Sequence, residues 1–276
     1  MSENNTKNVS VVGYGYVGKA MVQMLKDHFN VLVYDPGYSI KDNYENIKFC
    51  SSAEDLQIGE LGIICVPTPQ SNDGHCDITA VEESVKRLNT PVIMIKSTVS
   101  PGTTEKLKKE TGKRIIFSPE YVGESKYYNP YFNNDMKAIP FFIVGGDNED
   151  CNYALKYMVD ILGPTKQYYK TTSLNAEVIK YMENSYFAMK VTFANEFYNI
   201  CKALGADWYS VREGWLLDPR VERMHTAVFP DKRGFGGKCL PKDTSGIVFA
   251  ANDAGYKPEF MEAMINSNKK FIKQND

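Results

Sequence analysis

The stretch from residue 9 to residue 35 constrains the fold more than any other part of this 276-residue chain. A short apolar run leads directly into Gly13-Tyr14-Gly15-Tyr16-Val17-Gly18, a helical pattern follows, and a second apolar run ends at Asp35. This order predicts a strand, a tight glycine turn, a helix and a second strand parallel to the first. A G-x-G-x-x-G segment alone is a weak signal, but here both flanking elements are present and an acid closes the second strand.

The glycine turn has the features of a dinucleotide-binding site. Gly13 permits the tight turn, Gly15 lets a pyrophosphate approach the backbone, and Gly18 lets the helix pack closely on the strand. The helix begins at about Tyr16 and Val17, and the N–H groups of such an N-terminus bind phosphate. The sequence therefore predicts that these five residues bind a dinucleotide.

Asp35 is the predicted ribose-binding acid of this site. A carboxylate at the end of the second strand accepts hydrogen bonds from the adenosine ribose hydroxyls. No arginine stands between Pro36 and Ile40 to hold a 2′-phosphate, so NAD is favoured over NADP. Without the glycine turn, Asp35 would read as an ordinary turn aspartate before Pro36-Gly37.

Three further apolar runs, at residues 61–66, 92–96 and 114–117, are each followed by polar residues. Continuous apolar runs separated by helical segments predict a parallel sheet, and in such sheets ligands bind beyond the carboxyl ends of the strands. Taken singly, each polar residue could also be a turn former or a helix cap. The residues expected to face this common crevice are Thr68, Thr98, Glu120 and Glu124.

The pattern predicts two domains. Residues 1–170 are expected to form a Rossmann-type, doubly wound α/β domain that binds NAD, and residues 171–276 a mainly helical domain. The second domain is built on a long central helix from about Leu174 to Leu204, which Gly205 ends. At 1.5 Å per residue this helix is roughly 45 Å long, so it is expected to be a spine and a dimer surface. Shorter helices are predicted after Asp207 and at residues 258–274.

A second set of candidate functional residues lies in a predicted glycine-rich loop of the helical domain, at residues 234–243, Gly-Phe-Gly-Gly-Lys-Cys-Leu-Pro-Lys-Asp. Three glycines in four positions let the backbone approach a ligand closely, and the lysines at 238 and 242 favour the thiolate form of Cys239, which is the nucleophilic form. Asp243 adds a carboxylate four residues away. A surface turn with a chance cysteine is the alternative, because single cysteines are usually inert.

Two other sets of polar residues have both a functional and an ordinary interpretation. Lys180 and Asn184 stand four residues apart on the predicted long helix, so they share one face. On their own they could belong to a solvated polar face. Arg220 could form a surface salt bridge as readily as a binding contact.

Composition narrows the class of ligand. The formal charge of −2, the pI near 6.0 and the lack of a clustered basic run argue against a nucleic-acid or membrane surface and favour a small molecule. The polar N-terminus has no signal-peptide core, and no apolar run approaches the roughly 20 residues of a membrane span, so a cytoplasmic protein is expected. The six cysteines and three histidines show no metal-ligand spacing, and no metal is expected.

The segment G-F-G-G-K-C-L-P-K-D resembles the active-site signature of the nucleotide-sugar 6-dehydrogenases, the UDP-glucose and GDP-mannose dehydrogenase family. V-P-T-P after residue 65, K-S-T-V-x-x-G-T after residue 95 and S-P-E-Y-V-G-E after residue 117 are similar to its cofactor and substrate motifs. The resemblance implies an NAD-dependent, four-electron oxidation of a sugar C6 alcohol to a carboxylate, with Cys239 as the nucleophile. For UDP-glucose the product is UDP-glucuronate, a precursor of polysaccharides.

The resemblance also implies roles for individual residues. Lys180 and Asn184 stabilise the oxyanion, Asp243, Glu120 and Glu124 are the candidate bases, and Thr98 is a candidate for orienting water. One departure is Gly123, where many members of the family have arginine or alanine. The remaining implied cofactor contacts are Thr68, Thr98, Glu124 and Lys242, and the implied substrate contacts are Glu120, Tyr121, Val122, Gly123, Glu124, Lys180, Asn184, Phe235, Gly236, Cys239 and, reaching into a neighbouring subunit, Arg220.

Several alternatives remain open. Members of this family continue into a third domain that covers the nucleotide base, and the sequence stops before it, so the substrate could be another nucleotide sugar such as GDP-mannose or a UDP-N-acetylhexosamine. A two-electron β-hydroxyacid dehydrogenase would share the glycine turn and the Lys-x-x-x-Asn helix but needs no thiol. A catalytically inactive NAD-binding or assembly module is the alternative outside the enzymes.

Overall fold

The computed structural model describes residues 7–38, 45–56, 59–71, 74–122 and 135–273. The chain divides into two compact units, residues up to 69 together with 77–180, and residues 70–76 together with 181–276. The first unit is built on a sheet and the second is helical. The predicted α/β fold with a following helical part is confirmed.

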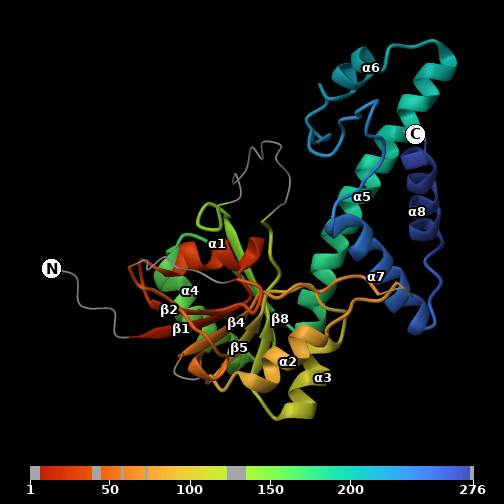
Figure 1. Cartoon of the computed structure of the whole chain (residues 1–276). Coiled ribbons are helices and arrows are strands. Elements are labelled where there is room, and N and C mark those ends of the chain that lie inside the picture. Colours follow the sequence, from red (N-terminus) through yellow and green to blue (C-terminus); the bar gives the residue numbers. More distant parts are fainter. Residues whose placement is uncertain (1–6, 39–44, 57–58, 72–73, 123–134, 274–276) are drawn as a thin grey trace. The chain divides into compact units, whose positions relative to one another are not determined.

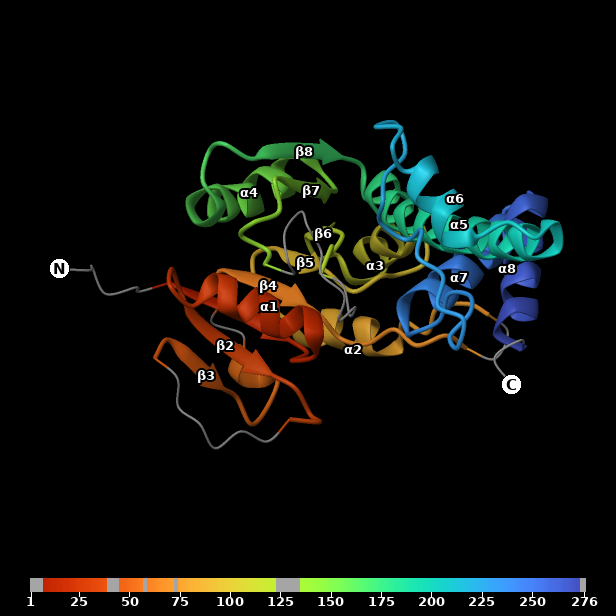
Figure 2. The same cartoon turned by 90° about the horizontal axis from the view of Figure 1, so that it is seen from above.

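The first unit contains an eight-stranded sheet in the order β3-β2-β1-β4-β5-β6-β7-β8, which Figure 2 shows from above. All neighbouring strands are parallel except β6 and β7, which run antiparallel and pair through Phe117 and Gly145. The prediction of a parallel sheet is therefore wrong at this one junction. The strands are β1 (Asn8–Val12), β2 (Asn30–Tyr34), β3 (Ile47–Phe49), β4 (Leu61–Ile64), β5 (Ile93–Ile95), β6 (Ile115–Phe117), β7 (Phe141–Gly145) and β8 (Gln167–Thr171).

Helices cover both faces of this sheet (Figure 1). Strand side chains alternate between the faces, so Met94 packs in the core cluster under α1 and α4, whereas Ile93 and Ile95 pack in the cluster under α2 and α3. Both clusters are apolar, which explains why the central strands read as continuous apolar runs in the sequence. The helices are α1 (Tyr16–Leu25), α2 (Thr79–Arg87), α3 (Thr103–Thr111) and α4 (Asn148–Leu162), with a 3₁₀ turn at Glu54–Leu56.

Helix α5 (Ser173–Leu204) begins in the first unit and continues into the second. Its Glu177 is fully buried and accepts hydrogen bonds from the backbone N–H of Gly102 (2.6 Å) and from the N–H (2.9 Å) and hydroxyl (2.6 Å) of Thr104. Burial raises the pKa of Glu177, and these three hydrogen bonds offset part of that cost. They anchor the first turns of α5 at the N-terminus of α3, so the compact unit extends to Lys180, beyond the boundary predicted after residue 170.

Replacing Glu177 by alanine should lower the free energy of unfolding by about 2 kcal/mol, because it leaves buried N–H and O–H donors without an acceptor. Urea unfolding followed by circular dichroism measures the change. Glu110→Ala on α3, the helix that Glu177 contacts, removes only an exposed carboxylate, and it should change stability by less than about 0.5 kcal/mol. Equal effects of the two substitutions would show that Glu177 does not anchor α5.

The second unit consists of the rest of α5, with α6 (Trp208–Trp215), α7 (Cys239–Asp253) and α8 (Glu259–Ile272). Helix α5 ends before Gly205, whose φ of +74° confirms the predicted glycine stop, and the side chain of Asp207 caps α6 by accepting from Ser210 N–H at 2.8 Å. Gly246 lets α7 approach α5 closely, because a Cβ there would lie 3.2 Å from the ring of Tyr181. None of the described helices has the length and apolar composition to span a membrane.

Candidate active site

The glycine turn of the first unit has the geometry that a dinucleotide needs. Gly13 has φ of +91°, and a Cβ at this position would lie 2.7 Å from the carbonyl of Cys65. A Cβ on Gly18 would lie 2.0 Å from the carbonyl oxygen of Gly13, so the first turn of α1 packs directly on the loop. A Cβ on Gly15 would meet no atom within 4 Å. Open space at Gly15, between two closely packed glycines, fits a pyrophosphate at the N-terminus of α1.

Asp35 follows β2 and joins the two loops of this site. Its carboxylate accepts hydrogen bonds from the backbone N–H groups of Tyr14 (2.6 Å) and Gly37 (2.8 Å), one on each oxygen. Each carboxylate oxygen has a further lone pair, which leaves acceptors for the two hydroxyls of a ribose. The position and partners of Asp35 therefore fit the ribose-binding role that the sequence predicts.

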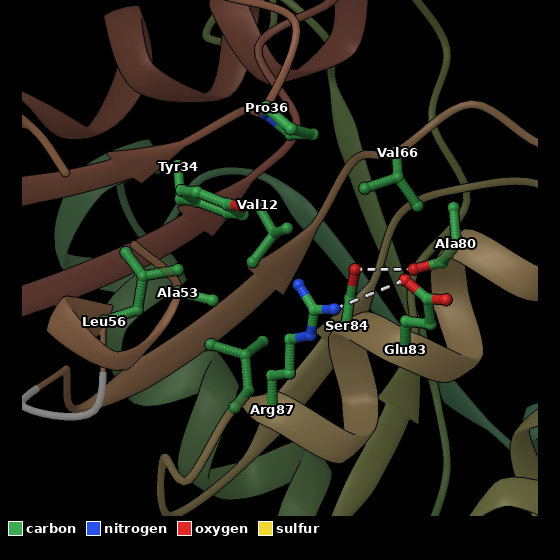
Figure 3. Close-up of a pocket in the computed structure, with 11 residues that line it drawn as sticks. Val12, Tyr34, Pro36, Ala53, Leu56, Val66, Ala80, Glu83, Ser84 and Arg87 are labelled. Carbon is green, nitrogen blue, oxygen red and sulfur yellow. Dashed lines mark hydrogen bonds and ion pairs between the residues drawn. The ribbon is translucent and has the colours of Figure 1, made fainter. Parts of the chain in front are cut away.

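A small pocket opens next to Asp35, between the ends of the strands and α2 (Figure 3). Its volume is about 90 Å³ and most of its lining is apolar. On α2 the Ser84 hydroxyl donates to the carbonyl of Ala80 at 2.6 Å, so it presents no free donor to the pocket. An apolar pocket that begins at the residue after the ribose acid suits an adenine ring, and the sequence analysis did not identify it. It is lined by Val12, Tyr34, Pro36, Ala53, Leu56, Val66, Ala80, Glu83, Ser84, Arg87 and Leu88.

Replacing Gly15 by alanine should weaken NAD binding about tenfold or more while leaving stability within about 0.5 kcal/mol of wild type. The reason is that the added methyl group has space in the protein itself but occupies the approach of the pyrophosphate. Isothermal titration calorimetry with NAD and a thermal melt measure the two effects. Gly214→Ala, at an equally open position on α6, is the control and should leave NAD affinity unchanged. Equal NAD affinity of Gly15→Ala and wild type would contradict the pyrophosphate position.

The two predicted cofactor threonines lie together. The hydroxyl of Thr68, after β4, donates to the backbone carbonyl of Thr98, after β5, at 2.7 Å. The neighbouring Ser97 hydroxyl donates to the carbonyl of Val66 at 2.7 Å, so the same two loops are joined twice. These contacts bring the carboxyl ends of adjacent parallel strands together, as the sequence predicts.

Glu120 and Lys180 form a buried ion pair. The ammonium of Lys180 lies 3.1 Å from the Glu120 carboxylate and donates to the Glu120 backbone carbonyl at 2.7 Å. The other carboxylate oxygen of Glu120 accepts from the N–H of Val122 at 2.9 Å, and the ring of Tyr121 lies 5.5 Å from the ammonium. The structure thus joins a predicted base and a predicted oxyanion-stabilising group. Gly123 and Glu124, also predicted here, lie outside the described residues.

Asn184 and Asp243 meet in the second unit. The amide of Asn184 donates to the Asp243 carboxylate at 2.5 Å, and the ammonium of Lys242 pairs with the other oxygen at 2.5 Å. Asp243 is buried and Lys242 partly so. Cys239 is the first residue of α7, and Asp243 lies one turn further along the same helix.

Cys239 lies in a helix and not in the predicted loop. The glycines end at Gly237, and α7 begins at Cys239 with Pro241 in its first turn. Proline is tolerated there because the N–H groups of a first turn have no intrahelical partner. Cys239 therefore stands at a helix N-terminus, where a negative charge is stabilised.

The thiols differ in reactivity. Burial raises the pKa of Cys65 to about 12 and that of Cys151 to about 11, and it also raises the pKa of the partly buried Cys50. Such groups are neutral thiols near neutral pH. No disulfide joins the six cysteines, all of which lie in the described part of the chain, and Cys239 is partly exposed.

The loop that precedes Cys239 is fixed by residues that the sequence analysis missed. The buried guanidinium of Arg233 donates to the side-chain and backbone oxygens of Asn195 (2.6 and 3.0 Å) and to the side chain of Asn199 (3.0 Å), all from α5. The amide of Asn268 on α8 accepts from the N–H of Phe235 (2.7 Å) and donates to its carbonyl (2.9 Å). Asparagines on α5 and on α8 thus hold this loop in place.

The predicted substrate residues of this loop differ in exposure. Phe235 is buried in a cluster with Ala188 and Met264, whereas Gly236 has open space where a Cβ would stand. Arg220 is 87% exposed and pairs with Asp218 at 2.6 Å. Gly236 and Arg220 are therefore accessible to a ligand, whereas Phe235 anchors the loop in this apolar cluster.

Models of one protein family match most of the chain. Residues 34–162 match the description "UDP-glucose/GDP-mannose dehydrogenase family, NAD binding domain", and residues 174–270 match the central domain of the same family. The NAD match covers the end of β2, Asp35 and the strands that carry the threonines and Glu120. NAD as the cofactor is thereby confirmed.

Individual relatives carry related names. The chain is 27% identical to the UDP-glucose 6-dehydrogenase of Haloferax volcanii over 94% of its own length. Its structure is similar to that of a UDP-glucose dehydrogenase from Pyrobaculum islandicum (TM-score 0.80, 25% identity, 98% of this chain and 70% of that one) and of a UDP-D-ManNAc dehydrogenase from Pyrococcus horikoshii (TM-score 0.79, 25% identity, 96% and 68%). The chain spans 69% of the Haloferax relative and 63–66% of two Bacillus subtilis UDP-glucose 6-dehydrogenases.

Proposed function

Since this chain belongs to the UDP-glucose/GDP-mannose dehydrogenase family, we propose that it oxidises the C6 alcohol of UDP-glucose to the carboxylate of UDP-glucuronate with two NAD. One observation carries the chemistry. Cys239 starts a helix on which Asp243 follows one turn later, and Asp243 is hydrogen-bonded to Asn184. A two-electron dehydrogenase has no use for that thiol and its neighbouring carboxylate.

The cofactor is held by the residues of the glycine turn, by Asp35 and by the paired threonines Thr68 and Thr98, with Lys242 and Glu124 as further contacts. Bound NAD supplies the acceptor for the hydride that leaves C6 in each of the two oxidations. Two observations support this position for NAD. Gly15 has open space for the pyrophosphate, and each oxygen of Asp35 has a further lone pair for a ribose hydroxyl.

In the first oxidation, Lys180 and Asn184 stabilise the negative charge that develops on the C6 oxygen as its proton is removed. Glu120 or Glu124 takes that proton. Preorganised donors of this kind contribute most when their position is fixed before the reaction, and the ion pair with Glu120 holds Lys180 in this way. The product of this step is an aldehyde at C6.

In the second oxidation, the thiolate of Cys239 attacks the aldehyde carbon and forms a thiohemiacetal. Loss of hydride from the same carbon, with transfer of the hydroxyl proton to Glu120 or Glu124, gives a thioester. Water, oriented by Thr98 and deprotonated by Asp243, Glu120 or Glu124, then attacks the thioester carbon, the C–S bond breaks, and Cys239 leaves as a thiolate. The carboxylate product carries the oxygen of that water.

The substrate is proposed from the relatives and from the accessible residues. Several relatives are named for UDP-glucose, while others are named for UDP-N-acetyl-D-mannosamine, so a different nucleotide sugar is the second candidate. The sugar and its diphosphate would contact Tyr121, Val122, Gly123, Gly236 and the exposed Arg220 of a neighbouring subunit. An inactive NAD-binding module is the remaining alternative.

We propose that the protein works as a cytoplasmic homodimer that supplies precursors for polysaccharides. Support for the dimer comes from α5, which exposes a row of large apolar side chains that a partner helix could cover. Light scattering coupled to gel filtration tests it, with a dimer mass expected. The exposed residues are Met182, Tyr186, Phe193, Phe197, Ile200 and Leu204.

The experiment that tests the function is incubation of the protein with NAD and one nucleotide sugar at a time, with NADH absorbance as the signal. UDP-glucose should give the highest kcat/KM of a panel that includes GDP-mannose and UDP-N-acetylhexosamines. A higher kcat/KM with another sugar nucleotide corrects the substrate and keeps the chemistry. No NADH with any of them would support the inactive module.

A further inference from the structure

Lys96 is a buried lysine that opens the K-S-T-V-x-x-G-T motif, but the mechanism gives a role only to Thr98 of that motif. It follows β5 and is only 4% exposed. Its ammonium donates to the hydroxyl of Ser118 at 3.1 Å and to the backbone carbonyl of Pro119 at 2.9 Å, and it lies 5.3 Å from the ring centre of Phe142. Every one of these partners belongs to the first unit.

The contacts of Lys96 lead directly to Glu120. Pro119 and Glu120 are consecutive, and their backbone carbonyls accept from the ammonium groups of Lys96 and Lys180 respectively. Ser118, the other partner of Lys96, donates its hydroxyl to the carbonyl of Ile143 on β7 at 2.7 Å. Ser118, Pro119 and the candidate base Glu120 are therefore held in place by Lys96, by Lys180 and by strand β7.

Burying the charged ammonium of Lys96 costs free energy of folding. Burial lowers its pKa to about 8, an effect that Cys65 and Glu120 partly counter and that Lys180 reinforces. Among the described residues, these three are the ionisable groups that face it, from the residue after β4, from the loop after β6 and from α5. A buried ammonium that served packing alone could be replaced by an apolar side chain with no loss of stability, so its presence calls for another explanation.

We propose that Lys96 is a positioning residue for the oxidation, which fixes the Pro119–Glu120 peptide so that the Glu120 carboxylate stays paired with Lys180 during turnover. This role rests on the proposed function. Lys96 acts through Glu120 and does not touch the substrate. Fixing a reacting group to within a fraction of an ångström is worth about 100-fold in rate, which sets the scale of the expected effect.

The first test is a double-mutant cycle between Lys96→Met and Glu120→Gln, with kcat and KM measured for UDP-glucose and NAD. Lys96→Met alone should lower kcat about 10- to 100-fold and change KM for NAD by less than about threefold. In the Glu120→Gln background the same substitution should lower kcat by less than about threefold, because the group it positions is already changed. Independent, multiplicative losses would overturn the proposal.

Lys113→Met is the matched control. Like that of Lys96, the ammonium of Lys113 donates to backbone carbonyls, here those of Val85, Lys86 and Leu88 at the end of α2. Its loss should lower stability and leave kcat unchanged. If Lys113→Met lowers kcat as much as Lys96→Met does, both effects are structural and the positioning role is wrong.

The second test measures the pH dependence of stability and does not require enzyme activity. Because the folded-state pKa of Lys96 is about 8 and the value in the unfolded chain is 10.5, the unfolded chain binds more protons between these values, and stability rises with pH there. From about pH 7.5 to about pH 9.5, the unfolding equilibrium constant of wild type should fall about 20-fold relative to that of Lys96→Met. Parallel pH dependences of the two proteins would overturn the buried charge on which the proposal depends.

Two further outcomes separate the proposals. A wild-type protein that reduces no NAD with any sugar nucleotide overturns the proposed function and the role of Lys96 together. An active wild type with unchanged kcat in Lys96→Met overturns only the role of Lys96. If Lys96→Met does not fold, Ser118→Ala takes its place in the cycle, since it removes the hydroxyl that orients the ammonium, and it should lower kcat about threefold to tenfold only when Glu120 is present.

Discussion

The Cys239→Ser variant should form the uronate at least about 10³-fold more slowly than wild type while binding NAD with unchanged affinity. A serine hydroxyl is far less nucleophilic than a thiolate at neutral pH, so the covalent adduct with the aldehyde does not form. Cys239 is not among the residues proposed to hold NAD, so NAD binding should be retained. Product is measured by chromatography of the nucleotide sugars, and NAD binding by calorimetry.

Cys50→Ser is the control for this substitution. Cys50 is partly exposed and forms no disulfide, as is true of Cys239, but it follows β3 in the first unit. Its replacement should leave the rate of uronate formation within about twofold of wild type. Uronate formation by Cys239→Ser at the wild-type rate would rule out the thioester route.

The Lys180→Met variant should lower kcat by about 10² to 10³ and also lower stability by about 3 kcal/mol. The first effect follows from the proposed role of Lys180 in stabilising the oxyanion. The second follows because Glu120 is left buried without its partner, 3.1 Å from where the ammonium stood. Steady-state kinetics and urea unfolding separate the two.

Two further variants distinguish these effects. Lys180→Met combined with Glu120→Gln should recover most of the lost stability, because no unpaired charge remains, and none of the lost activity. Lys190→Met, on the same helix, removes a lysine that pairs with Glu222 at 2.9 Å in the second unit, and it should leave kcat within about threefold of wild type. Recovery of activity in the double variant would mean that Lys180 serves only to neutralise Glu120.

The parts that the sequence predicts well are those where one residue type is required by local geometry. Gly13 has a left-handed backbone conformation and a contact that exclude a side chain, so the turn can be identified from the glycine itself. The long helix has no interior glycine or proline and stops at Gly205, and its predicted bounds agree with α5 to within one residue. Apolar runs likewise identify the buried strands of the sheet.

Strand β8 and the start of α7 were not predicted, because their residue types are not typical of a buried strand or of a helix. Strand β8 reads Gln-Tyr-Tyr-Lys-Thr and is partly exposed, so it lacks the apolar run of the central strands. The start of α7 contains Pro241 and follows three glycines, which favour a loop. In both cases the tertiary structure decides: β8 pairs with β7 along five residues, and α7 packs against Tyr181.

The polar contacts that support the candidate site could not be predicted because they join residues far apart in the sequence. Glu177 reaches the N-terminus of α3, Lys96 reaches Pro119, and Asn268 pairs with Phe235. Each is an ordinary polar residue on its helix or strand, and only the folded chain shows what it contacts. The residues proposed to carry the chemistry, by contrast, lie in short motifs whose spacing is visible in the sequence.

The number of NADH molecules formed per molecule of nucleotide sugar consumed tests the central claim most directly. Oxidation of an alcohol through a cysteine-bound thioester to a carboxylate removes four electrons, and each NAD accepts two. With limiting UDP-glucose and excess NAD, the protein should form two NADH and one uronate per sugar. A ratio of one NADH per sugar, with an aldehyde or ketone as product, would contradict it.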